Sequence, residues 1–98
     1  MALETKAWDA AEILDTPEDV AAYISVWLED GSPDEIRRAL DTVARSRGIS
    51  ELSRRTGISR AGLYKALGDG GNPSFETMRA ILSAMGLRFA VTPLDDAA

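Results

Sequence analysis

The sequence predicts an all-α fold, a small helical bundle that contains a helix-turn-helix and ends in a short C-terminal β-strand. Two observations carry this prediction. Apolar residues recur at three- and four-residue spacing between repeated helix start signals. Residues 49–67 show the pattern of two short helices joined by a tight turn, and only residues 87–92 alternate as a strand does.

The N-terminal third of the chain is expected to hold two helices. A short helix begins at Asp9, where Glu12 completes a capping box. A second helix begins at Thr16, a capping residue followed by Pro17 in the first helical position, and it ends at Gly31. Its apolar residues form one stripe: Val20, Tyr23, Ile24, Trp27 and Leu28.

The third predicted helix starts at a full capping box, formed by Ser32 and Glu35 around Pro33. It runs to about Arg47, and Gly48 breaks it. Its core face consists of Ile36, Leu40, Val43 and Ala44.

The helix-turn-helix pattern of residues 49–67 has a physical basis. Ser53 is small enough for the two helices to approach closely, Gly57 tolerates the positive φ of a sharp turn, and Ser59 caps the second helix. Helices that cross steeply also need apolar contacts from both sides, which the pattern supplies at Leu52, Ile58, Leu63 and Ala66.

After a loop at residues 68–73, Ser74 caps a last helix whose left-handed C-terminal cap is Gly86. The apolar residues of this helix are Phe75, Met78, Ile81, Leu82 and Met85. Residues 87–92 then alternate as a strand that Pro93 stops. Because one strand has no partner within the chain, it either pairs with a second copy, joins a sheet of a partner protein, or stays a solvated tail.

Composition restricts the class of protein. The 98-residue chain suits one domain, and its 45% hydrophobic and 28% charged residues are ordinary for a globular protein. It has neither cysteine nor histidine, which removes disulfides and the commonest general base and metal ligand. We therefore expect no enzyme, no cofactor and no metal site. A signal peptide and an apolar run of roughly 20 residues are both lacking, so we expect a cytoplasmic protein without membrane contact.

Charge is distributed unevenly along the chain, whose net charge is −5. Residues 1–36 hold ten acidic residues and one basic residue, residues 37–65 hold eight basic and two acidic residues, and residues 66–98 hold two basic and four acidic residues. This basic block, residues 37–65, overlaps the helix-turn-helix. This asymmetry predicts different partners for the two halves, with solvated faces as the alternative.

The second helix of the motif is the predicted recognition helix for double-stranded operator DNA. An N-terminus that points into the major groove brings Arg60 to the base edges, where its planar fork can bond guanine. Serines near helix N-termini suit phosphate oxygens, and nearby arginines add sequence-independent attraction. The basic block favours this interpretation over a purely structural hairpin. The predicted DNA-binding residues are Ser50, Arg54, Arg55, Ser59, Arg60, Ala61, Tyr64 and Lys65.

The letters GISRAGLYKAL at residues 57–67, followed by GNPSFET at residues 71–77, resemble the addiction-module antidote family. These are HigA-like antitoxins with a lambda-repressor-type helix-turn-helix, and the resemblance extends over nearly the whole chain to about Pro93. It implies a homodimer that binds the operator of its own operon and neutralises a small basic RelE/HigB-like ribonuclease toxin. It also maps Ser59, Arg60, Ala61 and Lys65 onto positions that contact DNA.

The resemblance gives the acidic N-terminal region a candidate partner, because a basic toxin is attracted by acidic residues. Trp27 lies on an apolar stripe and is expected in the core, whereas Trp8 is a better interface anchor. The predicted toxin-binding residues are Trp8, Glu12, Asp15, Glu18 and Asp19. We thus expect an acidic segment at residues 1–31, a DNA-binding region at 32–93 and a flexible tail at 94–98, all within one compact domain.

Two other functions remain open at this point. A stand-alone helix-turn-helix regulator or phage-type repressor has the same fold without a toxin. An interaction module that has lost DNA binding is the other alternative.

Overall fold

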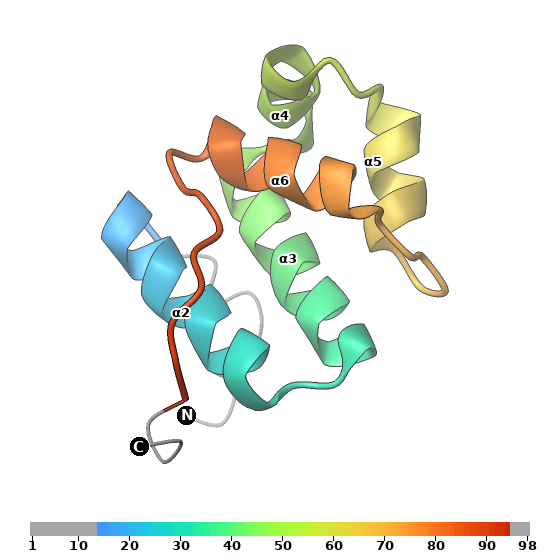
Figure 1. The fold of residues 1–98 in the computed structure, drawn as a ribbon. Coiled ribbons are helices and arrows are strands. Elements are labelled where there is room, and N and C mark those ends of the chain that lie inside the picture. Colours follow the sequence, from blue (N-terminus) through green and yellow to red (C-terminus); the bar gives the residue numbers. More distant parts are fainter. Residues whose placement is uncertain (1–13, 95–98) are drawn as a thin grey trace, which may run out of the picture.

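The computed structural model of the protein describes residues 14–94, which form helices and no strands. The helices are α2 (Pro17–Asp30), α3 (Pro33–Arg47), α4 (Ile49–Thr56), α5 (Arg60–Leu67) and α6 (Phe75–Ala84) (Figure 1). The all-α prediction is therefore confirmed for this part of the chain. The predicted short helix after Asp9, together with Trp8 and Glu12, lies outside the described residues.

Side-chain caps start four of these helices at the predicted residues. Thr16 and Ser32 form reciprocal capping boxes with Asp19 and Glu35, and in the second box both N–H···O distances are close to 3 Å, at 2.9 and 3.2 Å. The hydroxyl of Ser74 accepts the backbone N–H of the third residue of α6 at 3.0 Å. The helix boundaries were predictable because these signals act within three residues.

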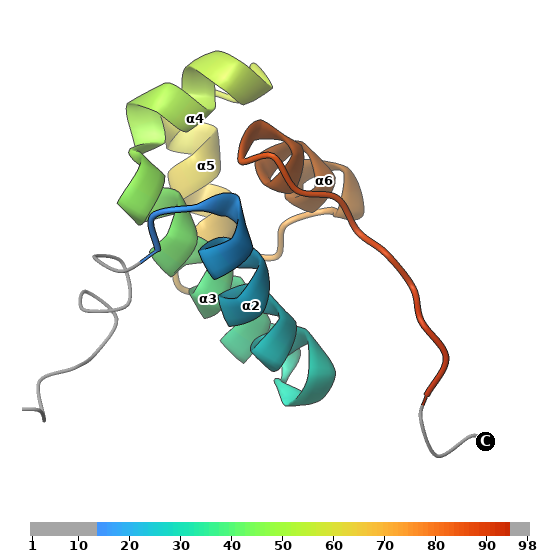
Figure 2. The ribbon, with the colours of Figure 1, turned by 90° about the vertical axis from the view of Figure 1, so that its left-hand side faces the viewer.

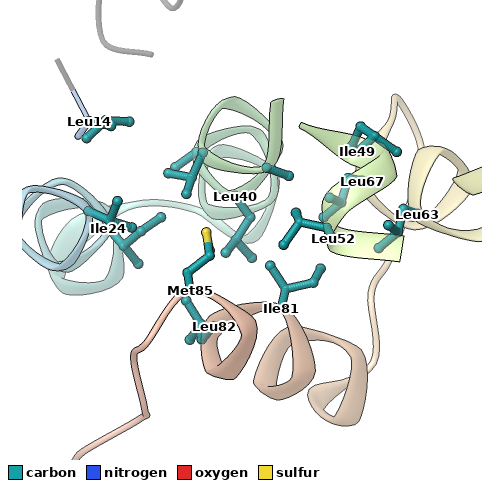
Figure 3. Packing of buried hydrophobic residues seen from close by; sticks show 14 residues of the cluster. Leu14, Ile24, Leu40, Ile49, Leu52, Leu63, Leu67, Ile81, Leu82 and Met85 are labelled. Carbon is teal, nitrogen blue, oxygen red and sulfur yellow. The ribbon is translucent and has the colours of Figure 1, made fainter. Parts of the chain in front are cut away.

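The helices α2 and α3 form an antiparallel hairpin, α4 and α5 also pack on α3, and α6 packs on α4 (Figures 1 and 2). Figure 3 shows Leu40, Leu52 and Ile81 converging from three different helices. The large side chains that are fully buried in this single core are Val20, Leu40, Val43, Leu52, Leu63, Leu67 and Ile81. Thus α5 buries one face in the core and leaves the other to solvent.

Each of two predicted apolar stripes includes a side chain that is exposed near an end of its helix. Trp27 packs against the core as predicted, but Leu28, at the end of the α2 stripe, is 43% exposed. Phe75, the first residue of α6, is 65% exposed and stacks on Phe89 with ring centroids 5.2 Å apart. Partly exposed apolar side chains therefore lie at the end of α2 and at the start of α6.

The predicted C-terminal strand is wrong within the described residues. Residues 87–94 are extended but form no sheet, because a strand needs a neighbour to receive its backbone hydrogen bonds and the described chain offers none. The last helical turn closes through Gly86, with φ of 83°, as the sequence predicted. Beyond that glycine the segment crosses α6 and runs away from the helices (Figure 2).

Candidate nucleic-acid interface

Residues 49–67, which we call the α4–α5 unit, have the predicted arrangement of helix, three-residue link and helix. Gly57 ends α4 with φ of 81°, a left-handed conformation that favours glycine. Ser59 then restarts the chain as α5, and its hydroxyl oxygen accepts the N–H of Gly62 at 2.9 Å. Leu52 and Leu63 are buried between the helices, so the unit is held by the core.

The outward face of α5 carries the side chains that the sequence assigned to DNA. Ser59, Arg60, Ala61, Tyr64 and Lys65 are all exposed. No ion pair within residues 14–94 involves Arg60 or Lys65, so both cations are available to an anionic partner. The arrangement can therefore present one arginine and one lysine, five residues apart in the sequence, to a nucleic acid groove.

Ser50 and Arg60 are brought together although ten residues separate them. The Arg60 Nη1 group donates to the hydroxyl oxygen of Ser50 at 3.2 Å, which joins the start of α4 to the start of α5. Both residues are exposed. This contact orients the guanidinium along the surface of the unit before any ligand is present.

Glu51 neutralises part of the basic surface that the sequence predicted. Its carboxylate accepts from Arg54 Nη2 at 2.5 Å and from Arg55 Nε at 2.7 Å. Hydrogen bonds from Arg54 and then Arg55 hold the pKa of Glu51 below its ordinary value. The spacing of three and four residues was a visible signal for these pairs. Arg55 also donates to the carbonyl of Ala84 at 3.3 Å, so it faces α6 rather than α5.

Tyr64 receives support from α3. The guanidinium carbon of Arg45 lies 5.7 Å from the centre of the Tyr64 ring, within the range of a cation–π interaction. Arg45 also pairs with Asp41 at 3.1 Å, one turn earlier on α3. An additional cation thus lies beside α5, but it is shared with a carboxylate.

Arg37 is the residue of this region that sequence reasoning missed. Only 5% of it is exposed, and its Nη1 group donates to the backbone carbonyl of Leu67 at 2.5 Å. Its Nε and Nη2 groups donate to Asp34 at 3.2 and 2.8 Å. The hydrogen bond from Arg37 is the leading cause that lowers the pKa of Asp34. This side chain ties the C-terminal end of α5 to the start of α3.

Two glycines explain why the ends of α5 tolerate little change. A Cβ at Gly62 would lie 3.1 Å from the Ser59 hydroxyl and 3.2 Å from Ile58, so the capping contact has little spare room. A Cβ at Gly71 would overlap the carbonyl oxygens of Ala66 and Lys65. Gly62 is therefore accounted for by the crowded cap of α5.

The predicted toxin-binding residues that the structure describes lie around the N-terminal end of α2. Asp15, Glu18 and Asp19 are all exposed. Asp19 also accepts the backbone N–H of Thr16 in the capping box, so it has a structural role. Asp15 lines a cleft beside α4 and the end of α6, in which the Nε of Arg47 is buried without a hydrogen-bond partner among the described residues.

No cluster of carboxylates or other ligating side chains within residues 14–94 could hold a metal ion. No helix there is long and apolar enough to cross a membrane.

Comparisons with known proteins indicate the family of this chain. A family model described as "probable addiction module antidote protein" matches residues 4–93. An uncharacterized protein of Haemophilus influenzae is 40% identical over 91 residues, which cover 93% of this chain and 94% of that relative. No solved structure matches the chain.

Proposed function

Because this chain belongs to the family of probable addiction module antidote proteins, we propose that it is the antitoxin of a type II toxin–antitoxin pair. The family match over residues 4–93 is the observation that carries this role. The proposed toxin is a small basic ribonuclease of the RelE/HigB-like kind, neutralised by direct binding. The chain would act in the cytoplasm as a HigA-like homodimer that also represses its own operon.

For repression, α4 and α5 act as a lambda-repressor-type helix-turn-helix with α5 in the major groove. The support is geometric: α5 exposes Arg60 and Lys65 with no carboxylate partner among the described residues, and its N-terminus is free of acidic residues. Arg60 reads a base, and Lys65 contacts a base or a phosphate. Ser50 and Ser59 lie at the two helix starts, where backbone N–H groups favour phosphate oxygens.

The DNA proposal is tested by a gel shift on the promoter upstream of the gene, repeated at increasing salt. Arg60→Ala should lower affinity and relax sequence preference at one position, by about tenfold or more for a bidentate contact. Arg79→Ala is the matched control, because Arg79 is also exposed but lies on α6. If Arg60→Ala and Arg79→Ala change DNA affinity and sequence preference equally, Arg60 does not read a base.

For toxin binding, the acidic start of α2 is the proposed contact, with Asp15, Glu18 and Asp19 exposed on it. Trp8 and Glu12 belong to the same proposed surface but lie outside the described residues. Acidic residues favour a basic partner chiefly through faster, salt-sensitive association.

The toxin contact is tested by charge reversal at two equivalent positions. Glu18 and Glu76 are both exposed and both occupy the second residue of their helix, so reversal costs the same interaction with the helix dipole. Glu18→Lys should slow toxin association severalfold, whereas Glu76→Lys should not. Deletion of residues 1–15 that leaves toxin binding intact would argue against this surface.

The antitoxin role itself is tested by growth of a host that expresses the neighbouring small reading frame with and without this chain. Arrest by the neighbour and rescue by this chain are the expected results. If the neighbour is harmless, the toxin proposal fails and the α4–α5 unit supports the second candidate, a stand-alone helix-turn-helix regulator.

A further inference from the structure

A pocket of about 410 Å³, which we call the α2–α3 pocket, lies between the end of α2, the start of α3 and the residues that precede α6. Its walls are mainly apolar and include Leu28 from α2, Ile36 from α3 and Met78 from α6. Protein interiors hold few voids larger than a water molecule, so this volume is not a packing defect. It falls within the range of about 300–1,000 Å³ that is typical of small-molecule sites.

Leu28 leaves apolar surface uncovered at this pocket. It is 43% exposed, whereas its neighbour Trp27 packs against the core. Among the described residues, none after Met78 lines the pocket, so the C-terminal segment does not fill it. An apolar ligand that enters the pocket removes this surface from water, which favours binding.

Arg37 brings a buried hydrogen-bond donor to the same pocket, which it also lines. A guanidinium has five N–H groups. The hydrogen bonds within residues 14–94 use three of them, because Nε and Nη2 donate to Asp34 and Nη1 donates to the carbonyl of Leu67. One N–H on Nη1 and one on Nη2 remain, and Asp69, at 3.8 Å from Nη2, is too distant to accept either. Since the side chain is only 6% exposed, a ligand in the pocket can supply the acceptor that water supplies at an exposed arginine.

The charged groups beside Arg37 balance one another. Asp34 already pairs with Arg37 at 2.8 Å and with Arg38 at 3.3 Å. Asp69 lies 3.8 Å from Arg37 and adds the second negative charge. Because two arginines and two aspartates meet here, an ionic ligand would find no unpaired counter-ion among the described residues. A carbonyl oxygen needs only a donor, so a neutral acceptor fits this site.

We propose that the α2–α3 pocket binds a small neutral molecule that has an apolar body and one carbonyl oxygen, such as a ketone, an ester or an amide. The apolar body lies against Leu28, Ile36 and Met78, and the carbonyl oxygen accepts a hydrogen bond from Arg37. Small-molecule sites commonly combine a large apolar wall with a few polar groups that fix the orientation of the ligand. This site is separate from the exposed face of α5 and from the start of α2, which the proposed function assigns to DNA and to the toxin.

Fluorescence titration of the full-length protein with a propionyl-substituted dimethylaminonaphthalene tests the proposal. This neutral aromatic ketone emits more strongly and at shorter wavelength in apolar surroundings. The expected result is saturable binding of one molecule per chain. In protein with isotopically labelled methionine methyl groups, the ketone should also move the NMR signal of Met78, which lines the pocket. The signal of Met85, which is buried in the core and does not line the pocket, should stay in place.

Two matched comparisons test the apolar wall and the donor. Leu28→Asp should weaken ketone binding at least about tenfold, because a carboxylate beside the aromatic ring loses its hydration. Val26→Asp should not, since Val26 is 64% exposed on the same helix and does not line the pocket. The analogue that carries a propyl group in place of the propionyl group should bind at least about threefold more weakly, because it offers Arg37 no acceptor. Circular dichroism should show the same helix content in both variants.

Three results would overturn the proposal. If the ketone neither binds saturably nor moves the Met78 signal, the pocket takes no ligand of this class, and loss of toxin binding in Leu28→Asp would then assign it to a protein partner. Equal binding to Leu28→Asp and Val26→Asp would place the ketone elsewhere on the protein. Equal binding of the ketone and its propyl analogue would mean that Arg37 donates no hydrogen bond to the ligand. The titration needs neither DNA nor toxin, so its failure is distinct from failure of the proposed antitoxin role.

Discussion

Replacing Arg37 by methionine should destabilise the protein far more than the same change at Arg38. The two residues are adjacent on α3 and both pair with Asp34, with Arg37 Nη2 at 2.8 Å and Arg38 Nε at 3.3 Å. They differ in burial, because the Arg37 side chain is 6% exposed and the Arg38 side chain 64%. Only Arg37 also donates to the carbonyl of Leu67.

The magnitude follows from the separate contacts. A charge-assisted hydrogen bond to a buried carbonyl contributes about 1.5–3 kcal/mol, and its loss leaves that carbonyl unpaired. The pair with Asp34, which is 61% exposed, adds at most about 1 kcal/mol. Arg37→Met should therefore cost about 2–4 kcal/mol of unfolding free energy. Arg38→Met should cost no more than about 0.5 kcal/mol.

Urea denaturation followed by circular dichroism measures both values. With a slope of about 1 kcal/mol per molar for a small protein, Arg37→Met should lower the midpoint by about 2 M or more. Because Leu67 is the last residue of α5, operator affinity should fall as well under conditions where the variant remains folded. Equal midpoint shifts in the two variants would refute the reasoning, since the contact with Leu67 would then add nothing to a surface ion pair.

Three further predictions concern the same region. Glu51→Gln should raise DNA affinity about two- to fivefold at low salt, because it leaves the charges of Arg54 and Arg55 unpaired. A gel shift measures this affinity, and an unchanged affinity would mean that the two arginines do not face DNA. Gly71→Ala should lower the unfolding free energy by about 1–3 kcal/mol through overlap with two carbonyl oxygens, while the exposed Asn72→Ala should be nearly neutral. The pKa values of Asp34 and Glu51 are lowered from their ordinary values of 3.8 and 4.5, so these ionised carboxylates stabilise the fold when the pH is above that range. The free energy of unfolding should decline as the pH falls through and below that range. Glu51→Gln should make this decline shallower in melting curves recorded at a series of pH values.

Local signals made most of the helices predictable from the sequence. The caps at Thr16, Ser32, Ser59 and Ser74 each act within three residues, and Gly57 marks a turn by its conformational freedom alone. The exposure of α5 followed from the same pattern, because helical spacing tells which face is apolar. The DNA-binding and toxin-binding assignments rest on chemistry at those exposed positions and remain predictions.

Contacts between residues distant in the sequence were not predictable. The bond from Arg37 to Leu67 spans 30 residues, and the stack of Phe75 on Phe89 depends on the direction that the chain takes after Gly86. Strand-like alternation at residues 87–92 predicted a strand that the structure does not form. A strand depends on a neighbouring strand, which alternation along the sequence cannot reveal.

The number of basic residues in the basic block exceeds the number of unpaired positive charges that it presents at the surface. Eight basic residues lie in residues 37–65, yet the structure pairs five of them with carboxylates: Arg37 and Arg38 with Asp34, Arg45 with Asp41, and Arg54 and Arg55 with Glu51. Arg47 turns one nitrogen into the protein interior. Arg60 and Lys65 then carry most of the free positive charge on the face of α5. Each phosphate contact adds about 0.9 to the salt dependence of DNA affinity. We therefore expect the DNA affinity of each copy to depend only weakly on salt concentration. Glu51→Gln should make this dependence steeper, because it removes the carboxylate that pairs with Arg54 and Arg55.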